Sequence, residues 1–307
     1  MKPIIGILGP TAVGKSRLAL ELAQELKTEI ISADSMQIYK KFDIGTAKAS
    51  LEERALVKHH LIDVVEPDAN FSSYLFKKQT QLVLEDFEKR DLTPIIVGGT
   101  GFFFKNLLYQ FDFEEGSNLE EIRNDLQAKQ KEFGNEYLHN LLKEVDPASA
   151  EIIHINDGKK ITRALEIFYT TGQKKSEGKN EQKPLYPYIL FVLNRDRQKL
   201  YDDINKRVDI MVEQGLLKEV EYLYNSLPED CQSLKGIGYK ELIPYFKGEC
   251  SLEQSIELIK QHSRNYAKRQ ITFYKKMDVI WLDAELSVNQ LISAIKTEYF
   301  KKFNENL

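Results

Sequence analysis

The residues best suited to chemistry lie close to the N-terminus, where an apolar run over residues 4–8 ends in a glycine turn. Residues 9–16 fit the pattern G-x-x-x-x-G-K-[ST] without a mismatch. In such a loop the backbone N–H groups and the lysine ammonium surround a chain of phosphates, and the last hydroxyl can hold a shared Mg²⁺. We therefore expect Ser16 to be a metal ligand and the whole loop to bind phosphate: Gly9, Pro10, Thr11, Ala12, Val13, Gly14, Lys15 and Ser16.

Asp34 is a second candidate, because it ends the short apolar strand that the sequence predicts over residues 29–34. In a parallel sheet the ligand crevice lies beyond the carboxyl ends of the strands, which brings Asp34 to the same rim as Lys15. Three roles are open to its carboxylate: hydrogen bonding within an Asp-Ser turn, binding of Mg²⁺ as a Walker B acid does, and general-base catalysis. The local sequence does not separate these roles.

A third polar turn, Gly98-Gly99-Thr100-Gly101, follows another apolar run. Its N–H groups and the Thr100 hydroxyl are suited to binding phosphate oxygens at the same rim. The run before Gly98 lacks the terminal acid of a Walker B strand. This absence counts against an ordinary ATPase and leaves Asp34 as the prominent acid.

Bringing three such turns together requires a parallel sheet flanked by helices, so the sequence predicts an α/β fold. A helix over residues 71–90 is expected to have an apolar side with Leu75, Gln79, Leu82 and Phe87. A second long helix, over residues 195–214, carries Arg207 and ends before Gly215.

The middle of the chain has a different pattern. From about residue 114 to residue 171 it is helical and strongly charged, with breaks at Asp146-Pro147 and Asp157-Gly158, and a linker without hydrophobic residues follows over 172–183. We therefore expect residues 114–184 to form a helical insertion, and residues 1–113 and 185–307 to form the catalytic core.

Composition limits the partners. The chain has 307 residues, a net charge of −4 and no apolar run of membrane-spanning length. Its two cysteines have no metal or disulfide spacing, so we expect a cytoplasmic protein without a membrane partner, and we expect a monomer. The pair His59-His60 suggests a metal, but a structural role is favoured because no Cys or carboxylate stands at ligand spacing beside it.

Any nucleic-acid site must be a local patch, and residues 260–276 are the best candidate. This stretch is rich in Lys and Arg and has no acid, and Lys260, Arg264 and Lys268 recur at the spacing of one helix face. Tyr266, Phe273 and Tyr274 interleave with the cations, a pattern that suits a phosphate backbone with stackable bases. A solvated helix face is the alternative.

Several segments together carry a resemblance to a known family, the bacterial tRNA dimethylallyltransferases, also called tRNA isopentenyltransferases or IPP transferases. They cover nearly the whole chain in the family's order. The matching segments are GPTAVGKS at 9–16, ISADSMQIY at 31–39, DIGTAK at 43–48, HLID at 60–63, VGGT at 97–100, RALE at 163–166, GIGY at 236–239 and AKRQ at 267–270.

The resemblance implies a P-loop NTPase-like core that binds dimethylallyl diphosphate rather than ATP. It implies transfer of the five-carbon group to N6 of the adenosine just 3′ of the anticodon, position 37, in tRNAs that read codons beginning with U. Magnesium accompanies the diphosphate, and the tRNA anticodon stem-loop is the partner. The catalytic residues would then be Asp34 as general base, with Thr100 and Arg207 stabilising the leaving group.

The resemblance also implies a set of tRNA-contacting residues in the core and the insertion. They are Asp34, Ser35, Met36, Gln37, Thr100, Arg123, Lys159, Lys160, Ile161, Thr162, Arg163, Lys235, Gly236, Ile237, Gly238, Tyr239, Lys240, Lys268 and Arg269. Two departures are visible, Phe104 where many relatives carry Tyr and Lys240 where many carry Arg. The rival functions are an ATP-dependent kinase with the same phosphate loop and an RNA-binding module switched by a nucleotide.

Overall fold

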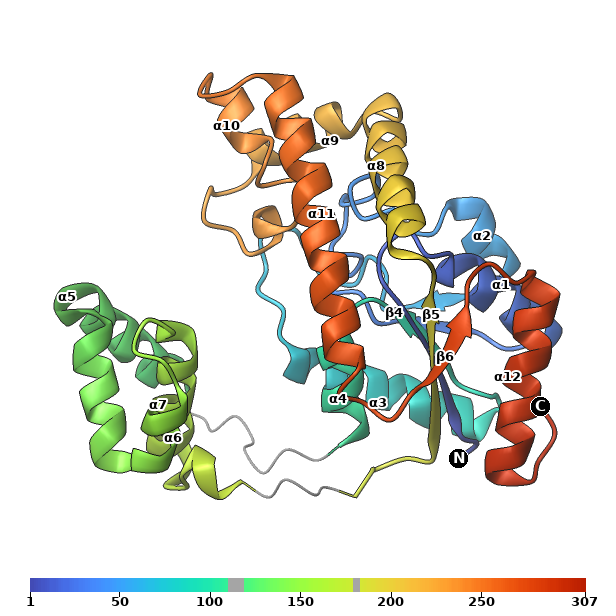
Figure 1. The fold of residues 1–307 in the computed structure, drawn as a ribbon, viewed down its shortest axis with the longest axis horizontal. Helices are drawn as coiled ribbons and strands as arrows, with labels where there is room; N and C mark the ends of the chain where they lie inside the picture. Colours follow the sequence, from blue (N-terminus) through green and yellow to red (C-terminus); the bar gives the residue numbers. More distant parts are fainter. Residues whose placement is uncertain (110–118, 179–182) are drawn as a thin grey trace. The chain divides into compact units, whose positions relative to one another are not determined.

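The computed structural model describes residues 1–109, 119–178 and 183–307 (Figure 1). They form two compact units: Met1–Leu108 with Leu185–Leu307, which we call the core, and Tyr109–Pro184, which we call the insertion. The predicted boundary at residue 113 lies outside the described residues, as do residues 114–118 of the predicted helical pattern and 179–182 of the predicted linker. The other predicted boundary, 184/185, coincides with the division in the structure.

The described part of the core contains a parallel six-stranded sheet in the order β3-β2-β4-β1-β5-β6 (Figure 1). Four of the strands are buried along their whole length or nearly so, as expected of short apolar runs in a sheet covered on both faces. The strands are β1 Ile4–Leu8, β2 Ile30–Ser32, β3 His59–His60, β4 Ile95–Gly98, β5 Tyr188–Asn194 and β6 Ile280–Asp283.

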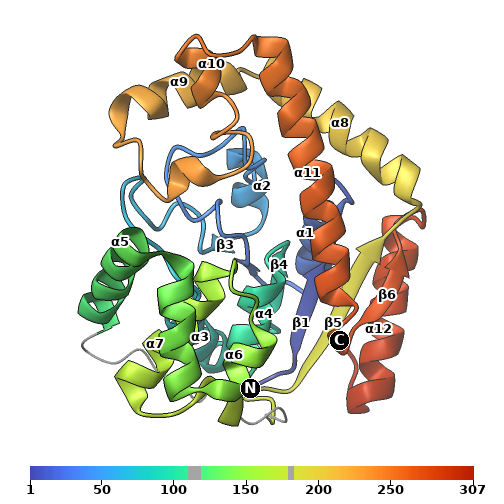
Figure 2. The same ribbon diagram turned by 60° about the vertical axis from the view of Figure 1, so that its left-hand side comes forward.

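Helices cover both faces of this sheet (Figures 1 and 2). Ile5 and Ile7 pack in one hydrophobic cluster with apolar residues of α1 and α12, whereas Gly6 between them faces Phe104 of α4. The core helices are α1 Lys15–Glu25, α2 Leu51–Leu56, α3 Ser73–Lys89, α4 Gly101–Leu108, α8 Arg197–Glu213, α9 Leu216–Ser226, α10 Ile243–Phe246, α11 Leu252–Tyr274 and α12 Val288–Phe303, with a 3-10 turn, η2, at Ser233–Lys235.

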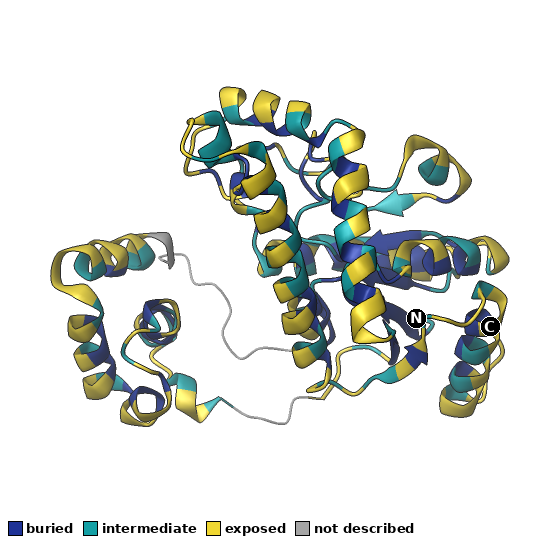
Figure 3. Cartoon of the chain, turned by 45° about the horizontal axis from the view of Figure 1, so that its top comes forward, coloured by how far each residue is buried: buried dark blue, intermediate teal, exposed yellow. Residues whose placement is uncertain are grey.

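The sheet order places β4 between β1 and β2. Figure 3 shows the central strands as the dark-blue buried layer beneath helices that are yellow on their outer sides. β4 and β2 approach so closely that a Cβ on Gly98 would lie 2.1 Å from the Ala33 carbonyl oxygen. The last residue of β4 must therefore be glycine for the three strand ends to meet at one rim.

The predicted helix over 71–90 is present as α3, but of its predicted apolar side only Phe87 is buried. Leu75 and Leu82 are 37% and 61% exposed, and the buried side contains Phe76, Leu84, Phe87 and also Thr80. Thr80 can be buried because its hydroxyl donates to the carbonyl of Phe76, 2.7 Å away. Because the buried face contains the polar residue Thr80, the hydrophobic pattern of the sequence did not identify that face.

The insertion is helical in its described part. Asp146 and Asp157 accept the N-terminal amides of α6 and α7, so both predicted breaks are confirmed as helix starts. A separate hydrophobic cluster that includes Leu138 and Leu142 of α5 with Ile161 and Leu165 of α7 holds the unit together. Its elements are α5 Leu119–Val145, α6 Pro147–Ile152, α7 Gly158–Thr171 and the 3-10 turn η1 Lys175–Glu177.

None of the helices in the described ranges combines the length and the apolar character that crossing a bilayer requires. The predicted structural role of the histidine pair fits their contacts. His60 Nε2 lies 2.6 Å from a Glu29 carboxylate oxygen, and His59 Nδ1 lies 2.7 Å from the Val57 carbonyl.

Candidate active site

A pocket of about 460 Å³ lies at the carboxyl ends of β1, β2 and β4, where the sequence predicted a common rim. Three turns meet there: the phosphate loop after β1, the segment from Asp34 after β2, and Gly98-Gly99 at the end of β4. The predicted site residues that line it are Thr11, Lys15, Ser16, Asp34, Ser35, Met36, Gln37, Arg207, Lys235, Gly236, Ile237, Gly238, Lys240 and Arg269.

The phosphate loop leads from β1 into α1 through a left-handed turn. Gly14, the residue before α1, has a φ of 96°, a conformation that side chains other than glycine rarely adopt. The Lys15 ammonium folds back over the loop and donates to the Pro10 carbonyl, 2.7 Å away. Gly9, Pro10, Ala12, Val13 and Gly14 themselves do not line the pocket, so only Thr11, Lys15 and Ser16 of the loop face it.

Two side chains of α11 fix this loop from outside. Gln270 accepts from the Thr11 backbone N–H at 3.2 Å and donates to the Gly99 carbonyl at 2.9 Å. The Tyr274 hydroxyl lies 3.2 Å from the Gly9 carbonyl and 2.8 Å from the Gly99 carbonyl. The helix thereby ties the ends of β1 and β4 together. Sequence reasoning missed this role because these are contacts between residues more than 170 positions apart.

Two cations of the pocket, Lys15 and Arg207, have lowered pKa values. Burial, and then the nearby Arg207 guanidinium, lower the pKa of Lys15 to about 7, although Asp34 acts in the opposite direction. Burial also lowers the pKa of Arg207, again against the effect of Asp34. Two crowded cations facing one carboxylate form a site that a polyanion would neutralise.

Asp34 makes the turn contact that the sequence offered as one of its three roles. Its Oδ1 accepts from the backbone N–H of Met36 at 2.9 Å and more weakly from that of Gln37 at 3.4 Å. Its other oxygen, Oδ2, accepts no hydrogen bond from the residues that the structure describes. The turn contact fixes the carboxylate in the pocket and leaves an oxygen for a ligand, so this role is compatible with either of the other two.

Thr100 does not line the pocket. Its Oγ1 accepts from the backbone N–H of Ser35 at 3.3 Å and lies 3.5 Å from the Ser35 hydroxyl. In this structure Thr100 therefore orients the turn that carries Asp34, and its predicted direct contact with the leaving group stays a prediction.

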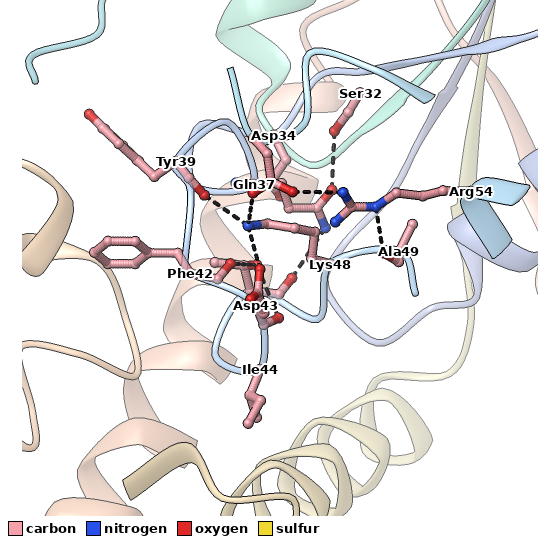
Figure 4. Close-up of polar contacts among 12 residues, drawn as sticks. Ser32, Asp34, Gln37, Tyr39, Phe42, Asp43, Ile44, Lys48, Ala49 and Arg54 are labelled. Carbon is pink, nitrogen blue, oxygen red and sulfur yellow. Dashed lines mark hydrogen bonds and ion pairs between the residues drawn. The ribbon is translucent and has the colours of Figure 1, made fainter. Parts of the chain in front are cut away.

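Gln37 projects beside Asp34 and close to the Asp43–Lys48 segment (Figure 4). Its Nε2 donates to the carbonyls of Thr46 and Ala47 at 3.2 and 3.3 Å, and its Oε1 accepts from Ser32 Oγ at 3.1 Å. Gly45, Thr46 and Ala47 also line the pocket, although the sequence had not placed them there.

An apolar wall completes the pocket, and the sequence analysis did not predict it. Ile204, Val208 and Met211 of α8 and Ile259 of α11 line it, and all four are less than 10% exposed. The α8 residues flank Arg207 at helical spacing, so one helix supplies a cation and an apolar surface to the same space. The available signal was this i, i+4, i+7 stripe around a candidate arginine.

Comparison with known proteins assigns the chain to a family. A family model described as IPP transferase matches residues 37–277, and another described as isopentenyl transferase matches residues 3–70. The chain belongs to the IPP transferase family. The resemblance seen in the sequence motifs is thereby confirmed.

Named relatives of this IPP transferase cover almost its whole length. A protein of Bacillus pumilus named tRNA dimethylallyltransferase is 46% identical over 285 residues, 92% of this chain and 90% of the relative. One from Bacillus licheniformis with the same name is 46% identical over 301 residues, 97% of this chain and 95% of the relative.

Solved structures of IPP transferases confirm the predicted P-loop NTPase-like α/β fold. A full-length tRNA isopentenylpyrophosphate transferase from Bacillus halodurans matches with a TM-score of 0.75 and 37% identity, over 99% of each chain. A eukaryotic dimethylallyltransferase described as acting on tRNA matches with a TM-score of 0.85 and 31% identity, over 100% of this chain and 81% of its own.

Within this IPP transferase, the basic stretch on α11 only partly matches the prediction. Lys260 is paired with Asp209 at 2.8 Å and Arg264 donates to Asn205 at 2.5 Å, so these two cations face α8 rather than solvent. Tyr274 is fully buried against the phosphate loop and is not available to stack on a base. Lys268 and Arg269 are exposed, as an RNA contact requires.

Three residues predicted to contact tRNA have buried side chains in this structure, so a contact from them would involve the backbone. Ile161 is 0% exposed in the hydrophobic cluster of the insertion, and Thr162 on the same helix is 9% exposed. Tyr239 is 0% exposed and donates to Glu219 at 2.7 Å. The sequence motifs that contain these three residues combine buried residues, which stabilise the fold, with exposed polar residues.

The cations of the insertion remain suited to an RNA contact. Lys159 and Lys160 are exposed at the start of α7. Arg123 and Arg163 both pair with Glu166, which is 4% exposed, at 2.8 and 3.0 Å. The side chains of Arg123 and Arg163 stay 41% and 43% exposed while they contact this carboxylate.

Proposed function

We propose that this chain is a tRNA dimethylallyltransferase, which transfers the dimethylallyl group of dimethylallyl diphosphate to N6 of adenosine 37 in tRNAs reading codons that begin with U. The relatives' names support the activity. The proposal rests mainly on the composition of the pocket. It combines a phosphate loop and two cations, Lys15 and Arg207, with the carboxylate of Asp34 and an apolar wall. A donor with a diphosphate and a five-carbon hydrocarbon requires this combination.

The diphosphate is held by the phosphate loop, with Lys15 and Arg207 as its cations. When the C1–O bond of the donor breaks, negative charge develops on the leaving diphosphate, and these fixed positive groups stabilise it without reorganising. Ile204, Val208 and Met211 enclose the hydrocarbon and exclude water from C1.

Asp34 accepts the proton. The lone pair of N6 is conjugated with the purine ring, so N6 is a poor nucleophile until its proton is removed. As the bond from N6 to C1 forms, the N6 proton passes to Asp34 Oδ2 and diphosphate departs. The adenosine must leave the base stack to reach a pocket of this kind. Gln37, Ser35 and Met36 lie beside Asp34 and contact the extruded base.

The residues present fit a Mg²⁺ ion carried by the diphosphate. Ser16 contributes a hydroxyl to the same pocket as Asp34, and no group of three or more His, Cys, Asp or Glu suited to a metal occurs among the described residues. Mg²⁺ commonly binds through one or two protein oxygens together with substrate phosphates. Bound in this way, it would supply further positive charge to the leaving group, with Ser16 as its protein ligand.

The tRNA anticodon stem-loop would rest on the exposed cations. In the core these are Lys235, Lys240, Lys268 and Arg269, and in the insertion they are those of α7 with Arg123. Such phosphate contacts make binding strongly salt-dependent. We further propose that the protein is cytoplasmic and monomeric. Analytical sedimentation would test the monomeric state.

One assay tests the function. The purified protein is incubated with unmodified tRNA and either dimethylallyl diphosphate or ATP, and the nucleosides are analysed by mass spectrometry. The expected result is adenosine carrying one C5H8 unit with dimethylallyl diphosphate only. A phosphorylated product with ATP would support a kinase, and salt-sensitive binding without a covalent product would support an RNA-binding module.

A further inference from the structure

A buried ammonium group fixes the loop over residues 43–48. This loop lies beside Asp34 and Gln37, on the side of the pocket where the adenosine is proposed to bind, which we call the acceptor side. The side chain of Lys48 is 1% exposed and lies at the centre of the contacts in Figure 4. Its Nζ donates to the Tyr39 carbonyl at 2.8 Å and to carboxylate oxygens of Asp43 and Asp63, both at 2.6 Å. Asp63 also pairs with Arg54 at 2.6 Å.

A second anchor, Glu219 of α9, holds the same loop from its other end. Its carboxylate accepts from three consecutive backbone N–H groups, those of residues 43, 44 and 45, at 3.0, 2.7 and 3.0 Å. It also accepts from the Tyr239 hydroxyl at 2.7 Å, and the Tyr239 ring packs against Gly45 so closely that a Cβ there would lie 2.6 Å away. Glu219 thus ties the 43–48 loop to the 236–239 turn, and both line the pocket.

Between the two anchors, the loop presents carbonyl groups to Gln37. Thr46 and Ala47 direct their carbonyl oxygens at Gln37 Nε2. Ala47 has a φ of 44°, a left-handed conformation that costs a non-glycine residue energy and persists only where the surroundings enforce it. With two carbonyls facing Nε2, the amide cannot turn over, because Oε1 would then oppose them. The orientation of Gln37 is therefore determined by the loop together with Ser32, whose hydroxyl donates to Oε1 at 3.1 Å.

We propose that Lys48 and Glu219 are positioning residues for the acceptor base, acting through the orientation of Gln37. The inference rests on the proposed function, since it concerns the adenosine that Asp34 deprotonates. The Gln37 amide stands next to Asp34 with its carbonyl oxygen fixed, and a carbonyl oxygen is the group that can accept a hydrogen from an exocyclic amine. Loss of either anchor releases the loop and allows the amide to turn.

The chemistry of the anchors favours this role over simple support of the fold. Taking the Lys48 ammonium out of water is costly even though its partners Asp43 and Asp63 stay 59% and 31% exposed, and apolar packing often stabilises a loop as well or better. What ionic groups provide is a defined geometry, and the loop between these anchors contains no helix or strand that would fix it otherwise.

The test compares Lys48→Met with Lys40→Met. Lys40 is exposed and pairs with Glu66 at the surface, so its variant controls for the loss of one lysine nearby. We expect Lys48→Met to lower kcat/KM for tRNA by at least about tenfold, the scale of a misplaced contact. The KM for dimethylallyl diphosphate should stay unchanged, because Gln270 and Tyr274 of α11 hold the phosphate loop independently of the Lys48 contacts. Lys40→Met should resemble the wild type.

A double-mutant cycle with Gln37→Ala separates positioning from structural support. If Lys48 acts through Gln37, Lys48→Met costs little further activity once Gln37 is alanine. An equal loss in both backgrounds, or a parallel rise of both KM values, would overturn the inference. Glu219→Gln keeps the size of the side chain but replaces an acceptor by a donor, and it carries the same cycle if Lys48→Met does not fold.

The two proposals fail in different ways. If the wild-type protein transfers no dimethylallyl group, the proposed function is wrong. If the wild type is active and both Lys48→Met and Glu219→Gln behave like Lys40→Met, only the positioning role is wrong.

Discussion

The lysine of the phosphate loop makes donor binding dependent on pH. Lys15 has a pKa of about 7 in the free pocket, because burial and the neighbouring Arg207 disfavour its charged form. The anionic diphosphate favours the ammonium, so binding must raise this pKa. Above pH 7, donor binding is therefore accompanied by proton uptake at Lys15.

The size of the effect follows from the pKa of about 7. At pH 8 about nine-tenths of the free protein has neutral Lys15, so binding takes up about 0.9 proton, against about 0.1 at pH 6. The affinity should fall about 100-fold between pH 6 and pH 9 for the same reason. The donor itself is fully ionised above neutral pH, so its own titration does not produce this loss.

Calorimetry measures both quantities. A non-reacting thio analogue of dimethylallyl diphosphate is titrated into the protein at pH 8 in two buffers with different ionisation enthalpies. Lys15→Met is the control, and it should bind weakly with no uptake from this site. Uptake near zero at pH 8 in the wild type, with an affinity that is flat from pH 6 to 9, would refute the reasoning.

The same shift affects the stability of the free protein. The pKa of Lys15 is lower in the folded state, about 7, than its ordinary value of 10.5, so the unfolded chain binds more protons between these values. The free energy of unfolding therefore increases as the pH rises through this window. Below pH 7 the contribution is lost, because the buried ammonium must be charged.

Three further variants test the remaining parts of the site. Asp34→Asn keeps an acceptor for the Met36 amide but removes the base, so tRNA binding should persist while kcat falls at least about 100-fold in a single-turnover assay. Arg207→Ala should mainly raise the KM for dimethylallyl diphosphate, and unchanged binding and turnover would show that Arg207 is wrongly placed. Gly98→Ala puts a Cβ 2.1 Å from the Ala33 carbonyl oxygen, so urea denaturation should show a loss of about 2 kcal/mol or more.

The rim of the sheet could be predicted from the sequence because each strand end combines two local signals. An apolar run ends in glycines or in an acid, and the parallel arrangement brings such ends together regardless of strand order. This is why Lys15 and Asp34 were placed at the same rim although β4 separates their strands. The order itself depends on contacts that no local pattern encodes.

Side chains whose partners are distant in sequence could not be interpreted in this way. Residues 260–276 looked like a basic surface, yet Lys260 and Arg264 face α8, and Gln270 and Tyr274 face the phosphate loop. A cation that neutralises an acid on another helix has the same local sequence as one that contacts phosphate. Lys268, Arg269, Lys275 and Lys276 keep the exposure that the pattern implied.

The donor side and the acceptor side of the pocket are held by different kinds of interaction, and this affects how sensitive each is to substitution. The donor side consists of strand ends and a glycine loop held by neutral hydrogen bonds from α11, so it is formed before any ligand arrives. The acceptor side consists of loops without regular structure, whose shape depends on the ionic anchors Lys48 and Glu219. A surface of this kind is easily altered by small losses of charge or geometry. Selection of the adenosine should therefore be more sensitive to substitution than binding of the diphosphate.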